Sequence, residues 1–202
     1  LSSNKEIDRI VKTDSGNYYV FPFIRESKDL CVYTGPIIRK DWLDKLKLPV
    51  PETIQEWEDM LLKFKNELGA DLPLSSLPGF FNQGFITGAF GVTSDFFVGK
   101  DGKVKHGPSE PGYQEYVKLM KRWYDIGILD RNFSSVDSNV LQTNILTSRT
   151  GATCHSAGAG IARWLPAMKD EDPNFDLVGA PYPVLNKGER PMFSVTEWIY
   201  NP

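Results

Sequence analysis

One helix constrains this chain more than any other feature. Thr53-Ile54-Gln55-Glu56 is a capping box, in which the Thr53 hydroxyl accepts a backbone N–H and the Glu56 carboxylate reaches back to another. Apolar residues then recur every three or four positions, which predicts an amphipathic helix that buries one face. That stripe consists of Ile54, Trp57, Met60, Leu61, Phe64 and Leu68. Gly69 is placed to end the helix, so the chain needs a second layer against which this face can pack.

Strand-like and helix-like segments alternate along the rest of the chain. Runs of aromatic, β-branched or small residues predict strands at 18–21, 30–33, 151–154, 175–180 and 193–200. Asp101-Gly102 predicts the turn of a hairpin over 96–105. Helices are expected at 39–46, from Pro111 to a cap at Gly127, from a cap at Ser138 to about 147, and at 161–168. The interleaving favours an α/β or α+β fold. Residues 72–92 are expected to be irregular backbone or helix ends around Phe80, Phe81, Asn82 and Gly84.

The second long helix has its own expected apolar stripe. Its members are Tyr113, Tyr116, Val117, Met120, Trp123 and Tyr124, spaced three and four apart or adjacent. We expect most of these aromatic side chains to belong to the core, because helical spacing places them on one face.

Size and charge exclude several classes of protein. The chain has 202 residues, of which 41% are hydrophobic and 24% charged, and its formal net charge is −3. These values are typical of a globular protein with a real core and argue against nucleic acid as a partner, because a sequence-independent nucleic-acid binder needs a basic face. No apolar run approaches the roughly 20 residues that span a bilayer. The chain opens without a Met or a signal peptide, and we expect a processed chain or a fragment.

Classical catalytic and metal-binding patterns are weak. Cys154-His155 suggests a nucleophile and base, but neighbours on a strand point to opposite faces, so a buried structural thiol is the stronger interpretation. Two cysteines are too few for a disulfide framework or a structural zinc site, and whether Cys31 pairs with Cys154 stays open. The acidic run at 170–172 lacks the spacing of a calcium loop. No metal and no cofactor are predicted.

The stretch Gly158-Ala159-Gly160-Ile161-Ala162-Arg163 follows a strand and opens a helix. It is a defective dinucleotide fingerprint, because Arg163 stands where a third glycine should allow close packing. Free N–H groups at this helix start could still face a polar ligand.

Aromatic residues make up 12% of the chain. Those on short elements or loops, such as Trp42, Phe81, Trp164 and Trp198, either belong to the core or form flat platforms at a pocket. Flat platforms suit the C–H faces of sugar rings, with neighbouring polar side chains binding the hydroxyls.

Three stretches together resemble a known family. Residues 38–57, from Ile38-Arg39-Lys40-Asp41-Trp42-Leu43 to Glu56-Trp57, resemble a signature of the extracellular solute-binding proteins of family 1, especially the lipoprotein branch that serves carbohydrate ABC transporters. The hairpin at 100–104 and the helix that ends in Trp123-Tyr124-Asp125-Ile126-Gly127 are similar to the next part of that family. Ser15-Gly16-Asn17-Tyr18-Tyr19-Val20-Phe21-Pro22 looks like its strand between lobes. Lys47 departs from the usual glycine.

The resemblance implies an α/β fold of the periplasmic-binding-protein type (type II class), in which two lobes close on a solute. A full member is about twice as long, so the chain is expected to be a fragment of a two-lobe protein, mainly its second lobe. The implied organisation is a hinge segment at 1–30, the second α/β lobe at 31–192 and a hinge-crossing strand at 193–202.

The implied function is binding, without catalysis. The family's proteins capture a carbohydrate and deliver it to an ABC-transporter permease, so we expect a carbohydrate ligand, a permease partner, a monomer and no enzymatic activity. The implied location is extracellular or periplasmic, with an N-terminal lipid anchor outside this chain. A receptor for another solute, such as a peptide, and a secreted glycoside hydrolase stay as alternatives.

Site residues are expected where strand ends and helix starts approach the hinge. The candidates are Arg39, Trp42, Phe81, Asn82, His155, Trp164, Glu197 and Trp198. Arg39 and Glu197 would bind hydroxyls or a charged group, and the aromatic side chains would stack on rings. For each candidate the alternative is a structural role; Trp42 in particular could anchor its short helix to the core.

Overall fold

The computed structural model describes residues 4–25, 27–32, 34–82, 84–193 and 199–200. The chain divides into two compact units, one formed by 1–33 and 195–202 and the other by 34–194. The expected organisation into a hinge segment at 1–30, a lobe at 31–192 and a hinge-crossing strand at 193–202 stays a prediction. The larger unit carries most of the secondary structure and is described first.

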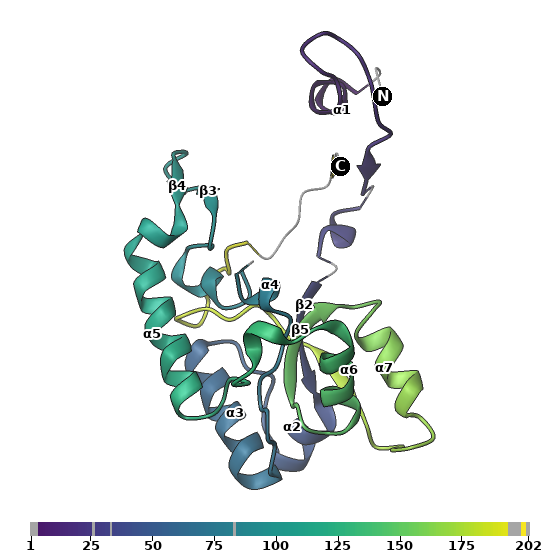
Figure 1. Ribbon diagram of the computed structural model, residues 1–202, viewed down its shortest axis with the longest axis vertical. Coiled ribbons are helices and arrows are strands. Elements are labelled where there is room, and N and C mark those ends of the chain that lie inside the picture. The colour runs from purple at the N-terminus through teal and green to yellow at the C-terminus, as the bar shows by residue number, and fades with distance from the viewer. Residues whose placement is uncertain (1–3, 26, 33, 83, 194–198, 201–202) are drawn as a thin grey trace. The chain divides into compact units, whose positions relative to one another are not determined.

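The larger unit is built on a three-stranded sheet (Figure 1). Its order is β5–β2–β6, with β2 (Thr34–Arg39) in the centre, flanked by β5 (Ala152–Ser156) and β6 (Leu177–Gly179). Both neighbours run antiparallel to β2. The register pairs Thr34 with Ser156 and Gly35 with His155, so the first residues of β2 lie beside the last residues of β5.

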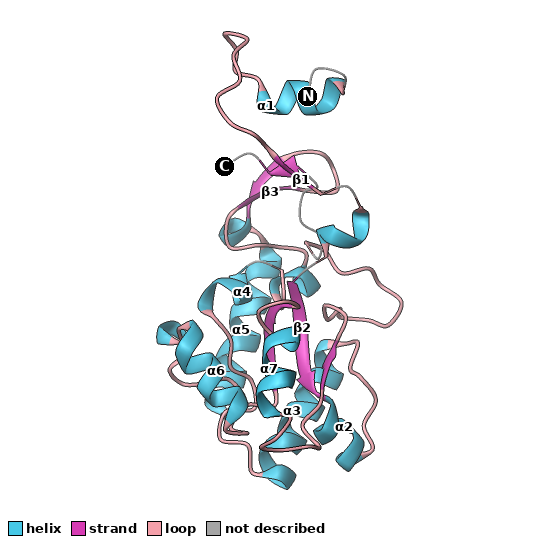
Figure 2. Cartoon of the chain, turned by 90° about the vertical axis from the view of Figure 1, so that its right-hand side faces the viewer, coloured by secondary structure: helices cyan, strands magenta, loops and turns pink. Residues whose placement is uncertain are grey.

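Helices cover both faces of this sheet (Figure 2). One face carries Ile38 and packs against α2 (Lys40–Leu46), α3 (Ile54–Leu68) and α5 (Pro111–Asp125). The other face carries Ile37 and packs against α6 (Ser138–Leu146) and α7 (Ile161–Met168). Successive strand residues point to opposite faces, which is why neighbouring isoleucines serve two cores. The fold is therefore α/β with three layers.

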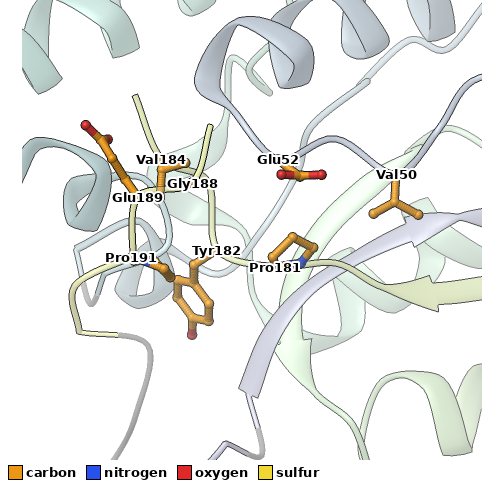
Figure 3. Close-up of a pocket in the computed structure, with 8 residues that line it drawn as sticks. All are labelled: Val50, Glu52, Pro181, Tyr182, Val184, Gly188, Glu189 and Pro191. Carbon is orange, nitrogen blue, oxygen red and sulfur yellow. The ribbon is translucent and has the colours of Figure 1, made fainter. Parts of the chain in front are cut away.

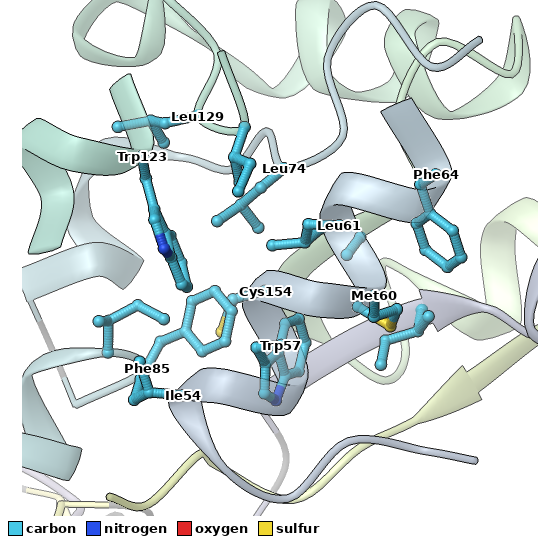
Figure 4. Packing of buried hydrophobic residues seen from close by; sticks show 14 of the residues in the cluster. Ile54, Trp57, Met60, Leu61, Phe64, Leu74, Phe85, Trp123, Leu129 and Cys154 are labelled. Atoms are coloured by element: carbon cyan, nitrogen blue, oxygen red, sulfur yellow. The ribbon is translucent and has the colours of Figure 1, made fainter. Parts of the chain in front are cut away.

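The central core lies against α3. Trp57, Leu61 and Phe64 are fully buried there (Figure 4). The predicted capping box is confirmed, since Glu56 N–H donates to Thr53 Oγ1 at 3.2 Å and Thr53 N–H donates to Glu56 Oε2 at 3.1 Å. Gly69 ends the helix with φ 72°, in the left-handed region that glycine adopts without strain.

The other long helix, α5, matches its predicted range and starts at Pro111. Its buried face holds Tyr116, Leu119 and Trp123, whereas Val117, expected in the stripe, is 48% exposed. Ile126 is the cap, and Gly127 follows with φ 70°. The cap of α6 is Asp137 instead of Ser138, because the Asp137 carboxylate accepts the N–H groups of residues 139 and 140.

The region 72–92, where irregular backbone or helix ends are expected, contains two short helices. It holds α4 (Pro78–Asn82) and the short 3-10 helix η2 (Thr87–Phe90). The hairpin is confirmed, with β3 (Phe96–Val98) paired to β4 (Val104–His106). Two more 3-10 turns, η3 (Gly107–Ser109) and η4 (Phe133–Ser135), precede and follow α5.

Two predicted strands near the N-terminus are wrong. Residues 18–21 form a loop, in which Tyr19 is 75% and Phe21 95% exposed. Residues 28–31 form the 3-10 helix η1 (Lys28–Cys31), and the strand comes later, through Gly35-Pro36. Pro36 is tolerated in the central strand because its nitrogen, which has no hydrogen to donate, faces the side on which the β6 ladder has already ended at Gly179. The Pro36 carbonyl on that side still accepts a hydrogen bond from Ala180 N–H at 2.9 Å.

The smaller unit is described by itself. It contains α1 (Lys5–Val11), capped by the Asn4 side chain, and a two-residue pair between β1 (Phe23–Ile24) and β7 (Ile199–Tyr200). Ile7 and Val11 are buried against Val20 and Ile24. The predicted final strand at 193–200 is seen at 199–200, while 194–198 lie outside the described residues.

Candidate functional site

The end of the sheet where β2 begins is the best candidate for a site in the larger unit. Thr34 is the first residue of this unit, and the chain leaves the unit after 194. The departing segment lies against the turn after α4, because a Cβ added to Gly84 would come within 2.8 Å of the Phe193 carbonyl oxygen. Within the larger unit, Thr34 therefore lies beside the end of β5, and Phe193 lies beside the turn that follows α4.

An aromatic group occupies this edge, which we call the strand-end site and define by Phe80, His155 and Trp164. The ring centroids of Phe80 and His155 are 5.7 Å apart, and those of His155 and Trp164 are 5.3 Å apart. Trp164 is only 2% exposed and supports the imidazole edge-on, whereas Phe80 and His155 are half-buried. A ligand at this edge would therefore meet Phe80 and His155, with Trp164 behind them.

His155 is held in its uncharged form. Burial lowers the pKa of His155 below its usual range, and the Ser156 backbone offsets only part of this effect. Nδ1 is buried and has no hydrogen-bond partner among the described residues. A neutral imidazole has one donor and one acceptor nitrogen, so His155 offers a polar atom beside the Phe80 ring.

The turn that leads from β5 into α7 uses several of its own N–H groups. Gly160 N–H donates to the Ser156 carbonyl at 2.8 Å, and Ala159 N–H donates to Ser156 Oγ at 3.3 Å. This internal bonding reduces what the helix start offers to a ligand.

Cys154 has the properties of a structural thiol. It is fully buried in the core of the opposite face, and burial raises its pKa to about 12. A raised pKa disfavours the reactive thiolate at neutral pH, which supports the interpretation of Cys154 as a buried structural thiol. Its backbone N–H donates to Ser76 Oγ at 3.3 Å, and the Ser76 hydroxyl donates to the Cys154 carbonyl at 3.0 Å.

Arg39 and Trp42 lie at the other end of β2. Arg39 is 2% exposed, and its guanidinium donates to both carboxylate oxygens of Asp41, at 2.8 and 2.6 Å. It also lies over the rings of Trp42 and Phe175, 4.7 and 4.4 Å from their centroids. With about 3.3 Å of rise per strand residue, Arg39 is more than 10 Å from the strand-end site. Arg39 and Trp42 were expected in one site with His155 and Trp164, but the structure does not bring the two pairs together.

Phe81 points away from the strand-end site. It is 2% exposed and lines an apolar groove of about 410 Å³ between α4, α5 and η4. Its neighbour Phe80, which the sequence analysis missed, faces His155 instead. Consecutive residues on a helix point about 100° apart, so α4 divides its two phenylalanines between two environments.

A separate pocket of about 380 Å³ opens beside the start of β2 (Figure 3). Glu52, Tyr182 and Glu189 line it, together with Val50, Pro181, Val184, Gly188 and Pro191. The Tyr182 hydroxyl donates to the Thr34 carbonyl at 3.3 Å, which connects this pocket to the same end of the sheet. The sequence carried no motif for Tyr182, because its place depends on non-local pairing.

Three predicted site residues are not located by the structure. Glu197 and Trp198 lie outside the described residues, and Asn82 ends α4 without a described side chain. Among the described residues, no group of three His, Cys, Asp or Glu side chains could hold a metal ion.

Known proteins similar to this chain are substrate-binding proteins of transporters. FusA of Streptococcus pneumoniae, a fructooligosaccharide ABC transporter substrate-binding protein, is 30% identical over 155 residues, which are 69% of this chain and 29% of FusA. A FusA EF-hand mutant in complex with fructo-nystose has a TM-score of 0.62 at 29% identity and covers 75% of this chain and 34% of its own. The alginate-binding protein AlgQ2, in a crystal structure without calcium ion, has a TM-score of 0.78 at 25% identity over 94% of this chain and 40% of AlgQ2.

This chain belongs to the solute-binding protein family of ABC transporters. Lipoprotein LipO of Bacillus subtilis supports the assignment, with 24% identity over 86% of this chain and 37% of LipO. No family model matches the chain.

The match covers only part of each solute-binding protein. The chain spans 29% of FusA and 37% of LipO, so it corresponds to a lobe-sized portion of the fold. The expected α/β, periplasmic-binding-protein-like fold is confirmed. In the part of the chain that the structure describes, no helix is long and apolar enough to cross a membrane.

Proposed function

We propose that this chain is part of the carbohydrate-capturing component of an ABC importer. The observation that carries the proposal is the relationship to FusA, whose name states a fructooligosaccharide, together with the likeness to alginate-binding AlgQ2. Both relatives bind chains of sugar units, which favours an oligosaccharide over a single sugar. These relatives are binding proteins and not enzymes, so the glycoside hydrolase alternative loses its support.

The strand-end site supports this proposal chemically. A sugar ring has an apolar C–H face and a rim of hydroxyl groups. The ring of Phe80 can stack on the C–H face, and the uncharged His155 can form a hydrogen bond with a hydroxyl group. The pocket that Glu52, Tyr182 and Glu189 line adds carboxylates that accept hydrogen bonds from hydroxyls.

The proposed mechanism is closure of two lobes without chemistry. Solute binds one lobe first, and contacts from the other lobe then favour the closed state, because a ligand stabilises the conformation to which it binds more tightly. The closed protein delivers the solute to the permease in the membrane. A lobe by itself supplies about half of the contacts and is expected to bind weakly. LipO is named a lipoprotein, which supports an extracellular or periplasmic protein that an N-terminal lipid anchors to the cell membrane. A monomer suffices for the mechanism.

The proposal is tested by thermal unfolding of this chain, and of a longer protein that contains both lobes, against mono- and oligosaccharides. A ligand at 100 times its Kd stabilises the folded state by about 2.7 kcal/mol, which is readily seen. We expect one class of oligosaccharide to stabilise the two-lobe protein strongly and this chain little. Stabilisation by peptides and by no sugar would contradict the carbohydrate assignment and leave the family intact.

A further inference from the structure

The strand-end site contains a polar atom that the protein itself leaves unused. His155 Nδ1 is buried and lacks a hydrogen-bond partner among the described residues, while the residue as a whole is half-buried. Nε2 is not among the buried unpartnered atoms. The two ring nitrogens therefore differ in environment, with Nδ1 facing inward and Nε2 on the accessible side.

This difference decides which nitrogen carries the proton. In a neutral imidazole one nitrogen is a donor and the other an acceptor. The Ser156 backbone lies close enough to raise the pKa of His155, but Nδ1 makes no hydrogen bond with it. Orphaned buried backbone N–H groups are rare in proteins, and by the same reasoning a buried imidazole N–H without an acceptor is disfavoured, so the hydrogen is favoured on Nε2. We infer that His155 is the Nε2–H tautomer and that this N–H donates to an oxygen of a sugar ring whose C–H face stacks on Phe80. The inference rests on the proposed function and assigns the roles of two residues in it.

The surroundings favour this fixed arrangement. Trp164 contacts the imidazole edge-on at 5.3 Å and Phe80 contacts it at 5.7 Å, so the ring is held between two aromatic side chains. Across the ladder, His155 faces Gly35, and the ring of Tyr182 lies 3.7 Å from where a Cβ of Gly35 would be. The site thus presents the Nε2–H donor of His155 beside the ring face of Phe80. This pair favours ligands that have an apolar face and an oxygen atom at the edge of that face.

The tautomer is tested directly by nitrogen NMR on the 202-residue chain. The chain has two histidines, so a His106→Gln variant assigns the signals of His155. Long-range proton–nitrogen correlation near neutral pH is expected to show a protonated Nε2 and an unprotonated Nδ1. A protonated Nδ1 would overturn the inference, whatever sugars do.

The role in binding is tested with variants in the two-lobe protein. His155→Gln keeps an N–H donor near the position of Nε2, whereas His155→Leu removes it at similar size. We expect His155→Leu to weaken sugar binding about tenfold and His155→Gln to retain most of the affinity, because one hydrogen bond is lost only in the former. Phe80→Tyr should bind as well as the parent and Phe80→Leu more weakly.

The outcomes separate the two proposals. Equal affinities for His155→Gln and His155→Leu in a protein that binds sugar would overturn the donor role and leave the proposed function in place. Failure of the unsubstituted two-lobe protein to bind any carbohydrate would overturn the proposed function and this inference with it.

Discussion

Trp123 Nε1 donates a hydrogen bond of 2.6 Å to Glu58 Oε2, and this bond ties α5 to α3 inside the core. Trp123 is fully buried and Glu58 is 6% exposed. The same carboxylate oxygen lies 2.5 Å from a guanidinium nitrogen of Arg122, whose side chain is exposed to solvent. The carboxylate is thus neutralised and hydrogen-bonded, the condition under which a buried charge is tolerated.

Removing that carboxylate should destabilise the fold. Glu58→Ala leaves the indole N–H buried without an acceptor, so we expect a loss of about 3 kcal/mol in the free energy of unfolding, measured by urea titration. Glu58→Gln keeps an acceptor oxygen and should lose less. Glu115→Ala serves as the control, because its pair with Lys118 is exposed and such pairs contribute little. Equal losses for Glu58→Ala and Glu115→Ala would show that the buried bond contributes nothing.

Gly151 is required by the packing of two aromatic rings. A Cβ there would lie 2.7 Å from Trp42 Cζ3 and would also contact Phe64, whose ring meets Trp42 edge-on at 5.2 Å. We expect Gly151→Ala to cost about 1–3 kcal/mol of unfolding free energy, as overpacking does. Gly179→Ala is the matched strand control, since nothing lies within 4 Å of its added Cβ. A thermal midpoint that both variants leave unchanged would contradict this account.

The local elements were predictable where the sequence carried a local signal. The capping box at Thr53, the proline at the start of α5 and the Asp-Gly turn of the hairpin each fixed an element within a few residues. The central strand was misplaced because Pro36 normally ends strands, and only the tertiary position of β6 explains why it does not do so here.

The candidate site was harder to predict, because it depends on which strand ends meet. His155 and Trp164 do come together, but Phe80 was missed since its role follows from its distance to His155. Arg39 was grouped with them because it follows a strand, yet antiparallel pairing places it at the opposite end of the sheet from His155. No sequence pattern distinguishes these two ends.

Arg39 is expected to act on stability and not on solute binding. Arg39→Met keeps the packing of the aliphatic part of the side chain but removes the guanidinium group that donates to Asp41. The free energy of unfolding should therefore fall by about 2 kcal/mol. Lys40→Met is the control, because its partner Asp44 is 64% exposed and the pair should contribute little. Urea titration measures the loss, and calorimetry on the two-lobe protein should show sugar affinity unchanged. A selective loss of affinity in Arg39→Met would restore it to the binding site.

Glu56 should make the start of α3 sensitive to acid. Lys187, followed by the backbone N–H of Glu52, lowers the pKa of Glu56 to about 2. A carboxylate whose pKa is lower in the folded state stabilises the fold above its unfolded pKa, near 4.5, and this contribution disappears as pH falls towards 2. Glu56→Gln should therefore reduce stability at neutral pH and flatten the acid limb of a stability–pH curve. Parallel curves for the parent and Glu56→Gln would contradict the assignment.

His155 should produce a second acid dependence, at higher pH. Burial lowers its pKa in the folded state below the ordinary value of 6.5, so on acidification the unfolded chain takes up this proton before the folded chain does. The contribution to stability is complete above about pH 6.5 and decreases as pH falls below it. Unfolding free energies from about pH 7.5 to about pH 5.5 should decline less in His155→Gln than in the parent. His106→Gln serves as the control for the parental slope, because His106 is the other histidine of the chain and is exposed, where it contacts Ser109 Oγ and the Phe96 ring. If His155→Gln kept that slope and His106→Gln lost it, the burial of the His155 imidazole could not be the cause.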